Sequence, residues 1–295
     1  NIGSKLQLPS DKHPHFVPST PTFCAYPGNN ESMLVNRRFV NYRINDEGGY
    51  DNHDYIETKN VMTEIVFNVD TDLWEVRKES FINYNTVHDN RYVGLEDVRV
   101  MPYGDKVYYN ANRGLNGNKM VIEHGWVNPE TFSTEDAVHL KYEKQHQIEK
   151  NWVMFEENNT MKMIYGWHPL IIGVVEKDTF KVTNTLKTPH LFKFLRGSTN
   201  GISVGNETWF MCHVVSYEDR RYYYHIMVMI DKTTHAIRYT RMFTFEQEKV
   251  EYTLGMMYRK STEDLLIGYS VMDRSTKYIS ISIESIEKMI TKDTT

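Results

Sequence analysis

Short runs of alternating hydrophobic and polar residues, separated by turn-forming residues, extend along most of the chain. Valine, isoleucine, tyrosine and phenylalanine dominate these runs, and segments such as Pro102–Lys106, Glu157–Thr160 and Val204–Glu207 read as turns between them. β-Branched and aromatic residues with period-two alternation favour strands, and closely spaced turns are typical of a sandwich, a barrel or a propeller. The pattern therefore predicts an all-β protein with few helices.

An internal repeat of roughly 45–70 residues distinguishes between these architectures, because it approaches the length of a propeller blade. Each unit holds a candidate second strand, with another strand before it and a third after it. The five second strands are Phe39–Arg43, Tyr109–Arg113, Ile164–His168, Phe210–His213 and Ile267–Ser270. We therefore expect one domain, a five-bladed β-propeller with four-stranded blades, and a large β-sandwich is the alternative.

The repeat also predicts the limits of the blades. They are expected at residues 22–70, 91–130, 148–182, 196–238 and 250–285. Residues 1–21 contain four prolines and are expected to form an extended arm. Ser282–Thr291 predicts a short C-terminal helix, because its apolar residues share one helical face.

Polar residues end the five second strands: Arg43, Arg113, His168, His213 and Ser270. Equivalent positions on different blades surround the same axis, so these residues are expected to converge on one funnel. The alternative is structural, because strands often end in polar residues near solvent.

The candidate first strands open with charged motifs: Glu96-Asp97-Val98-Arg99, Glu149-Lys150-Asn151-Trp152 and Arg196-Gly197-Ser198. Charges near a narrow channel are costly unless they are paired or used, so they form either an ion network or a reaction centre. Adjacent residues of a strand point to opposite faces. We therefore expect Asp97 to face the pocket, and Glu96 to brace a blade through an arginine or to meet a sugar hydroxyl.

These motifs resemble those of glycoside hydrolase family 130, which comprises mannoside phosphorylases and mannosidases, and the related β-1,2-mannosyltransferases. The resemblance covers roughly residues 30–275 and is closer still to putative glycosyltransferase propellers of giant viruses. Gly94–Arg99 matches the family motif with Val98 in place of proline, and Lys150–Phe155, Gly197–Gly201, His213 and Arg43 match further family positions. The resemblance implies that Asp97 is the general acid and that phosphate can attack directly, without a protein base.

Further side chains complete the predicted site. Sugar contacts are expected from Arg43, Glu96, Arg99, Arg113, Asn151, Trp152, Ser198, Asn200 and Tyr217. The phosphorylases carry an arginine where this chain has His168, so the anion site is expected to use a substitute set. Its members are Lys150, His168, Arg196, His213, Arg220 and Arg221, with His146 as a further candidate. This set suits inorganic phosphate or the diphosphate of a nucleotide sugar. Charged histidines would make anion binding weaken between about pH 6 and pH 8.

Composition limits the partners. The net charge is −5 and no Lys/Arg block is present, which argues against nucleic acid. No apolar run is long enough for a membrane helix, and the two distant cysteines indicate a reducing compartment, so we expect a cytoplasmic protein. Asp70-Thr71-Asp72 could hold a metal, but aspartate favours turns, and we expect neither a metal nor a bound cofactor.

The combined interpretation is an enzyme that makes or breaks a glycosidic bond with inversion. The predicted substrate is a mannoside-like glycan, with inorganic phosphate or a nucleotide sugar as co-substrate. An inverting glycoside hydrolase and a non-catalytic glycan-binding propeller are the alternatives.

Overall fold

The computed structural model describes residues 16–291, apart from residues 53, 69, 72, 85–88 and 117. Its strands form five sheets, each from a continuous stretch of chain. The first sheet contains β1 (Val17–Tyr26), β2 (Asn29–Val40), β3 (Ile56–Asn68), β4 (Leu73–Phe81) and the short parallel β5 (Tyr92–Val93). The second contains β6 (Leu95–Tyr103), β7 (Lys106–Leu115), β8 (Lys119–Val127) and β9 (Thr134–His139).

The second half of the chain repeats this arrangement. The third sheet contains β10 (Val153–Glu157), β11 (Thr160–Trp167), β12 (Leu170–Glu176) and β13 (Thr179–Leu186). After the 3₁₀ helix His190–Phe194, the fourth contains β14 (Leu195–Gly197), β15 (Ile202–Val204), β16 (Glu207–Tyr217), β17 (Arg221–Asp231) and β18 (Ile237–Tyr239). The fifth contains β19 (Glu251–Arg259), β20 (Asp264–Val271) and β21 (Lys277–Ser282), which leads into α1 (Ile283–Glu287).

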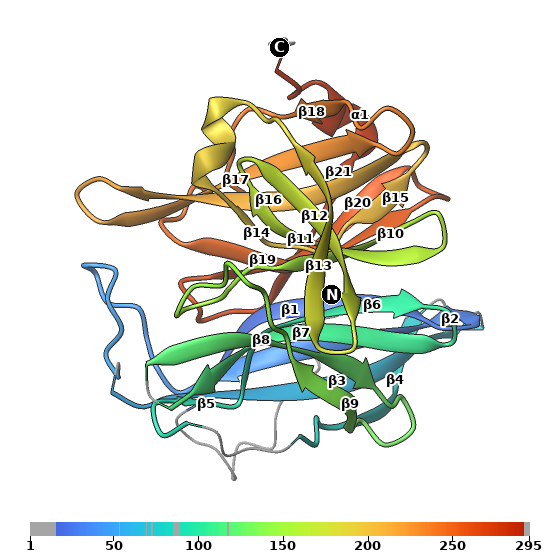
Figure 1. Cartoon of the computed structure of the whole chain (residues 1–295). Coiled ribbons are helices and arrows are strands. Elements are labelled where there is room, and N and C mark those ends of the chain that lie inside the picture. Colours follow the sequence, from blue (N-terminus) through green and yellow to red (C-terminus); the bar gives the residue numbers. More distant parts are fainter. Residues whose placement is uncertain are drawn as a thin grey trace.

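The sheets pack face to face around a ring. Separate apolar clusters join each sheet to the next, as the alternation of buried residues requires. Phe23 and Met33 of the first sheet pack with Leu266 of the last, which closes the circle. The protein is therefore a five-bladed β-propeller, with its first two blades in blue and green and the later blades in yellow to red (Figure 1).

The first blade extends past its predicted end at residue 70, because β4 (Leu73–Phe81) is its fourth strand, and three other features also differ from the sequence-based expectation. Residues 17–21 belong to β1 and not to an extended arm, whereas residues 1–15 lie outside the described residues. Prolines 18 and 21 fit there because β1 pairs only with β2, and a register irregularity separates them. The fifth blade has three strands, because the chain turns into α1 where a fourth strand was expected. This helix is also shorter than predicted.

Candidate active site

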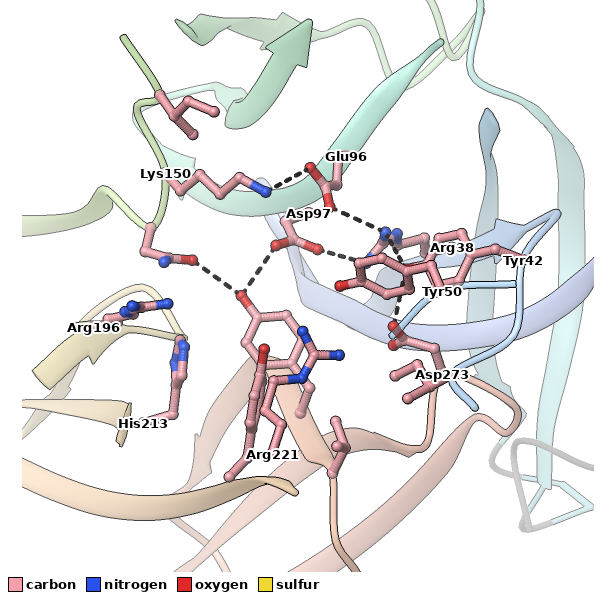
Figure 2. Close-up of a pocket in the computed structure, with 16 residues that line it drawn as sticks. Arg38, Tyr42, Tyr50, Glu96, Asp97, Lys150, Arg196, His213, Arg221 and Asp273 are labelled. Atoms are coloured by element: carbon pink, nitrogen blue, oxygen red, sulfur yellow. Dashed lines mark hydrogen bonds and ion pairs between the residues drawn. The ribbon is translucent and has the colours of Figure 1, made fainter. Parts of the chain in front are cut away.

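A cavity of about 350 Å³ opens where all five blades bring their inner segments together. Figure 2 shows its side chains converging from different strands. Arg38 comes from β2, Asp97 from β6, Arg196 from β14 and Tyr252 from β19, and Asn151 lies two residues before β10. The complete lining is Arg38, Tyr42, Ile44, Tyr50, Glu96, Asp97, Ile148, Lys150, Asn151, Arg196, His213, Arg221, Tyr223, Val250, Tyr252 and Asp273.

A β-bulge places both carboxylates of β6 in this pocket. Glu96 pairs with Asn112 and Arg99 with Asn110, so two residues of β6 lie opposite one residue of β7. Asp97 occupies the left-handed backbone region with φ 54°. Bulges disrupt strict alternation and re-aim side chains, often beside active sites. The expectation that Glu96 and Asp97 face opposite ways was therefore wrong, because the bulge lies between Glu96 and Arg99.

Asp97 is buried and held by three side chains. Arg38 Nη1 donates to its Oδ1 at 2.7 Å, while Tyr252 Oη at 3.1 Å and Asn112 Nδ2 at 3.3 Å reach its Oδ2. Glu96 forms an ion pair with the same Arg38 guanidinium, at 3.4 Å from Nη2, and a second ion pair with Lys150 Nζ at 3.5 Å. The orientation of Asp97 is therefore fixed, and the two adjacent negative charges are balanced by Arg38 and Lys150.

Arg99 is buried beneath the pocket and connects several blades. Its guanidinium donates to the carbonyl oxygen of Ser198 at 2.7 Å and to the Tyr252 hydroxyl at 3.0 Å. Burial raises the pKa of Tyr252 well above its usual value, and the charge of Asp97 adds to this effect. Tyr252 thus stays protonated and donates its hydrogen bond. Arg99 was expected to contact sugar, but the structure places it behind Asp97 as a support and outside the lining.

A series of hydrogen bonds links Arg38, the cation that holds Asp97, to Asp273 through Tyr42. Arg38 Nη2 donates to the Tyr42 hydroxyl at 3.0 Å, and Tyr42 donates to Asp273 Oδ2 at 2.9 Å. Ser19 donates to Asp273 Oδ1 at 2.8 Å. Asp273 therefore has a fixed position at the pocket wall and adds a third carboxylate to the site.

The opposite side of the pocket is basic. Figure 2 shows Lys150, Arg196 and His213 together on that side, with Arg221 on the adjoining wall. The guanidinium of Arg221 lies over the rings of Tyr50 and Tyr223, and its buried Nε and Nη2 have no hydrogen-bond partner among the described residues. Neighbouring Glu96 raises the pKa of Lys150. Lysine and arginine charges are thus available to an anionic ligand.

His213 contributes hydrogen bonding and not charge. Burial lowers its pKa well below the usual value, and nearby Arg196 lowers it further. Its Nδ1 lies 2.8 Å from the Ser198 hydroxyl, and its ring stacks on Tyr223. The expected loss of anion binding between pH 6 and pH 8 therefore does not follow from this residue.

Only His213 of the five expected strand-end residues lines the pocket. Arg43 is exposed because β2 ends at Val40, and Arg38 takes the predicted place beside the acid. His168 is exposed in the β11–β12 turn and contacts Thr188. Arg113 is buried in β7 and pairs with Glu123 at 3.3 Å.

Ser270, the fifth of these residues, is buried and hydrogen-bonds Thr20 at 2.7 Å.

Other residues that were expected to contact sugar also lie outside the pocket lining. Trp152 is buried in the core between the second and third blades, and its indole donates to Glu149. Asn200 is buried and bonds backbone atoms of Met154 and Val100, while Ser198 supports His213.

Two further residues differ from the expected site. Tyr217 is 75% exposed at the end of β16, and Arg220 is buried against the carbonyl oxygen of Asn45. The predicted residues that do line the pocket are Glu96, Asp97, Lys150, Asn151, Arg196, His213 and Arg221.

Sequence reasoning missed several lining residues: Arg38, Tyr42, Tyr50, Tyr252 and Asp273. Tyr252 lies near the start of the innermost strand of its blade, as Asp97 does. The repeat argument used for the first strands, extended to the fifth blade, would have found it. Arg38 lies inside a strand whose predicted limits were wrong.

No metal centre is formed by the described residues, because they contain no group of three or more His, Cys, Asp or Glu side chains suited to one. In the Asp-x-Asp segment, Asn68 accepts hydrogen bonds from the backbone of Asp70 and Thr71 as in a turn. Asp72 lies outside the described residues. Within the described part of the chain, no helix is long and apolar enough to span a membrane.

Comparisons with known proteins identify the fold. No protein-family model and no curated protein matches the chain. A β-1,2-mannobiose phosphorylase from Listeria innocua has a TM-score of 0.62 at 12% identity, covering 96% of this chain and 94% of that one. A mannose phosphorylase from Leishmania mexicana, in complex with phosphate, has a TM-score of 0.59 at 11% identity, with coverages of 91% and 85%. A GDP-Man-dependent mannosyltransferase from the same species has a TM-score of 0.58 at 8% identity, with coverages of 92% and 87%. The chain therefore shares their five-bladed fold.

Proposed function

We propose that this protein is a carbohydrate-active enzyme that makes or breaks a glycosidic bond with inversion. The supporting observation is the position of Asp97 in the pocket. Its carboxylate is fixed by Arg38 at 2.7 Å, Lys150 lies beside the adjacent Glu96, and Arg196 lines the same pocket. A fixed proton acceptor beside cations suits glycosyl transfer from a phosphate-linked sugar.

In the synthetic direction, the Asp97 carboxylate takes the proton of an acceptor hydroxyl as that oxygen attacks the anomeric carbon. The bond from the anomeric carbon to the phosphate oxygen breaks, and the phosphate leaves with the electron pair. Lys150 and Arg196 stabilise the charge on the leaving group. In the reverse direction, a phosphate oxygen attacks and protonated Asp97 donates its proton to the glycosidic oxygen. One displacement inverts the anomeric centre in either direction.

A mannoside-like substrate is part of this proposal. The three structural neighbours described above act on mannosides or transfer mannose, according to their names. Mannose 1-phosphate and mannose-containing acceptors are therefore the first substrates to assay.

Hydrolysis is the second candidate, and Asp273 is the observation that favours it. An inverting hydrolase needs a second carboxylate that activates water. Asp273 lines the same pocket and is linked to Arg38 through Tyr42. A hydrolase would release free sugar without any need for phosphate.

The test is a product screen. Sugar 1-phosphates, including mannose 1-phosphate, and nucleotide sugars are incubated with mannose-containing acceptors, and products are resolved by chromatography. We expect a new glycoside together with phosphate or a nucleoside diphosphate, and loss of both products in Asp97→Asn. Glycan binding without turnover would instead indicate a binding module, and phosphate-independent release of free sugar would indicate a hydrolase.

A further inference from the structure

A second hollow of about 420 Å³ adjoins the candidate active site. It lies between the entry to the third blade and the first strand of the fourth, next to Tyr165 and Gly166 of β11. The two hollows share four lining residues, Ile148, Lys150, Asn151 and Arg196. Any ligand that spans both must therefore pass Lys150 and Arg196.

The residues that line both hollows form a seam between them, and two of these residues, Lys150 and Arg196, are positively charged. The Arg196 side chain is exposed, and the structure gives its guanidinium no hydrogen-bond or ion-pair partner among the described residues. Lys150 is only loosely paired, at 3.5 Å from Glu96. An anionic group at the seam would thus find two cations that can reach it.

The second hollow has a mixed lining. Ile148, Leu195 and the ring of Tyr165 provide apolar surface, and His146 provides a polar edge. The Tyr165 hydroxyl is held by the Lys144 carbonyl oxygen at 3.2 Å and by Glu149 at 3.3 Å, and its ring packs against Tyr142 and Trp152, so a partly exposed part of the ring lines the hollow. A flat ring with polar edges suits such a surface better than a lipid tail, because aromatic rings stack on one another and polar edges need hydrogen-bond partners.

We propose that the donor is a nucleoside diphosphate sugar that spans both hollows. Its sugar lies beside Asp97, its diphosphate lies at Lys150 and Arg196, and its nucleoside occupies the second hollow. Inorganic phosphate or a sugar 1-phosphate would leave that hollow unused. This inference rests on the proposed function, because it places the reacting sugar at Asp97.

Gly166 offers a way to block the second hollow alone. A Cβ added at Gly166 meets nothing closer than 3.8 Å, so a side chain can start there without a backbone clash. Gly197 is unsuitable, because a Cβ there would lie 2.6 Å from the carbonyl oxygen of Asn151. Thr160→Val, at the exposed other end of β11, is the matched control.

The experiment measures binding of GDP, ADP, UDP, inorganic phosphate and mannobiose by titration calorimetry. We expect at least one nucleoside diphosphate to bind roughly tenfold or more tightly than phosphate, a difference that calorimetry resolves easily. Arg196→Ala should weaken phosphate and nucleotide alike. Gly166→Val should weaken the nucleotide at least about tenfold and leave phosphate unchanged, while Thr160→Val changes neither. Thermal melts confirm that each variant is folded.

Nucleotides that bind no more tightly than phosphate would overturn the proposal. So would a Gly166→Val variant that loses mannobiose and keeps the nucleotide, because the hollow would then hold the acceptor. Both outcomes leave the proposed function standing, since that depends on Asp97-dependent turnover. A failure of turnover in the product screen, with nucleotide binding intact, would instead count against the proposed function.

Discussion

Replacing Asp97 by asparagine tests the chemistry at its central group. Asparagine keeps the size of the side chain but cannot exchange the proton. A positioned acid or base typically contributes about 10²–10⁴-fold to rate, which corresponds to roughly 3–5 kcal/mol of transition-state stabilisation. We therefore expect turnover to fall by about this factor.

The surrounding contacts indicate that the variant folds. Arg38 keeps Glu96 at 3.4 Å and Tyr42 at 3.0 Å after the charge of Asp97 is removed. The Asn112 side chain can rotate its amide to accept from the new asparagine, because its Oδ1 has no hydrogen-bond partner in the structure. Removing one partner of a buried ion pair costs about 3–5 kcal/mol, and the remaining Glu96 should keep the loss near or below that lower limit.

The assay compares initial rates of product formation for the wild type, Asp97→Asn and Glu96→Gln, with sugar binding measured by calorimetry. Glu96 makes only long contacts to Arg38 and Lys150, at 3.4 and 3.5 Å, so Glu96→Gln should keep turnover within about tenfold. Sugar binding should survive in both variants. Near wild-type turnover by Asp97→Asn would refute the assignment of Asp97 as acid and base.

Two further predictions concern stability. Arg38→Met should lower the free energy of unfolding by about 3–5 kcal/mol in urea titrations, because it leaves Asp97 and Glu96 adjacent without their common cation; an unchanged midpoint would contradict this. Burial lowers the pKa of His124 to about 4 in the folded protein, whereas in the unfolded chain it is about 6.5. Between these two pH values the unfolded chain binds more protons than the folded protein. The free energy of unfolding therefore falls as the pH falls. Lowering the pH from 7 to 5 should therefore reduce the free energy of unfolding by about 2 kcal/mol through His124. His124→Gln should remove this part of the pH dependence, and equal pH dependence in both proteins would count against the prediction.

Patterns of neighbouring residues predict much of the fold. Period-two alternation and repeated turns predict strands, and their spacing predicts five similar units, because alternation follows directly from strand geometry. The charged entry motif around Asp97 also stands out within the chain, since unpaired charge is costly in a narrow channel. Strand limits do not follow from alternation alone: β2 ends at Val40, so Arg38 and not Arg43 lines the pocket.

The active-site geometry depended on contacts between distant segments. Asp97 meets Arg38 from 59 residues away and Tyr252 from 155 residues away, and closure of the ring brings both to it. The bulge that turns Asp97 into the pocket breaks the alternation from which its direction was inferred. By itself the sequence determined the strands and their repetition, because these follow from neighbouring residues. Only the tertiary structure decided which charges meet, because that depends on how five separate sheets pack around one axis.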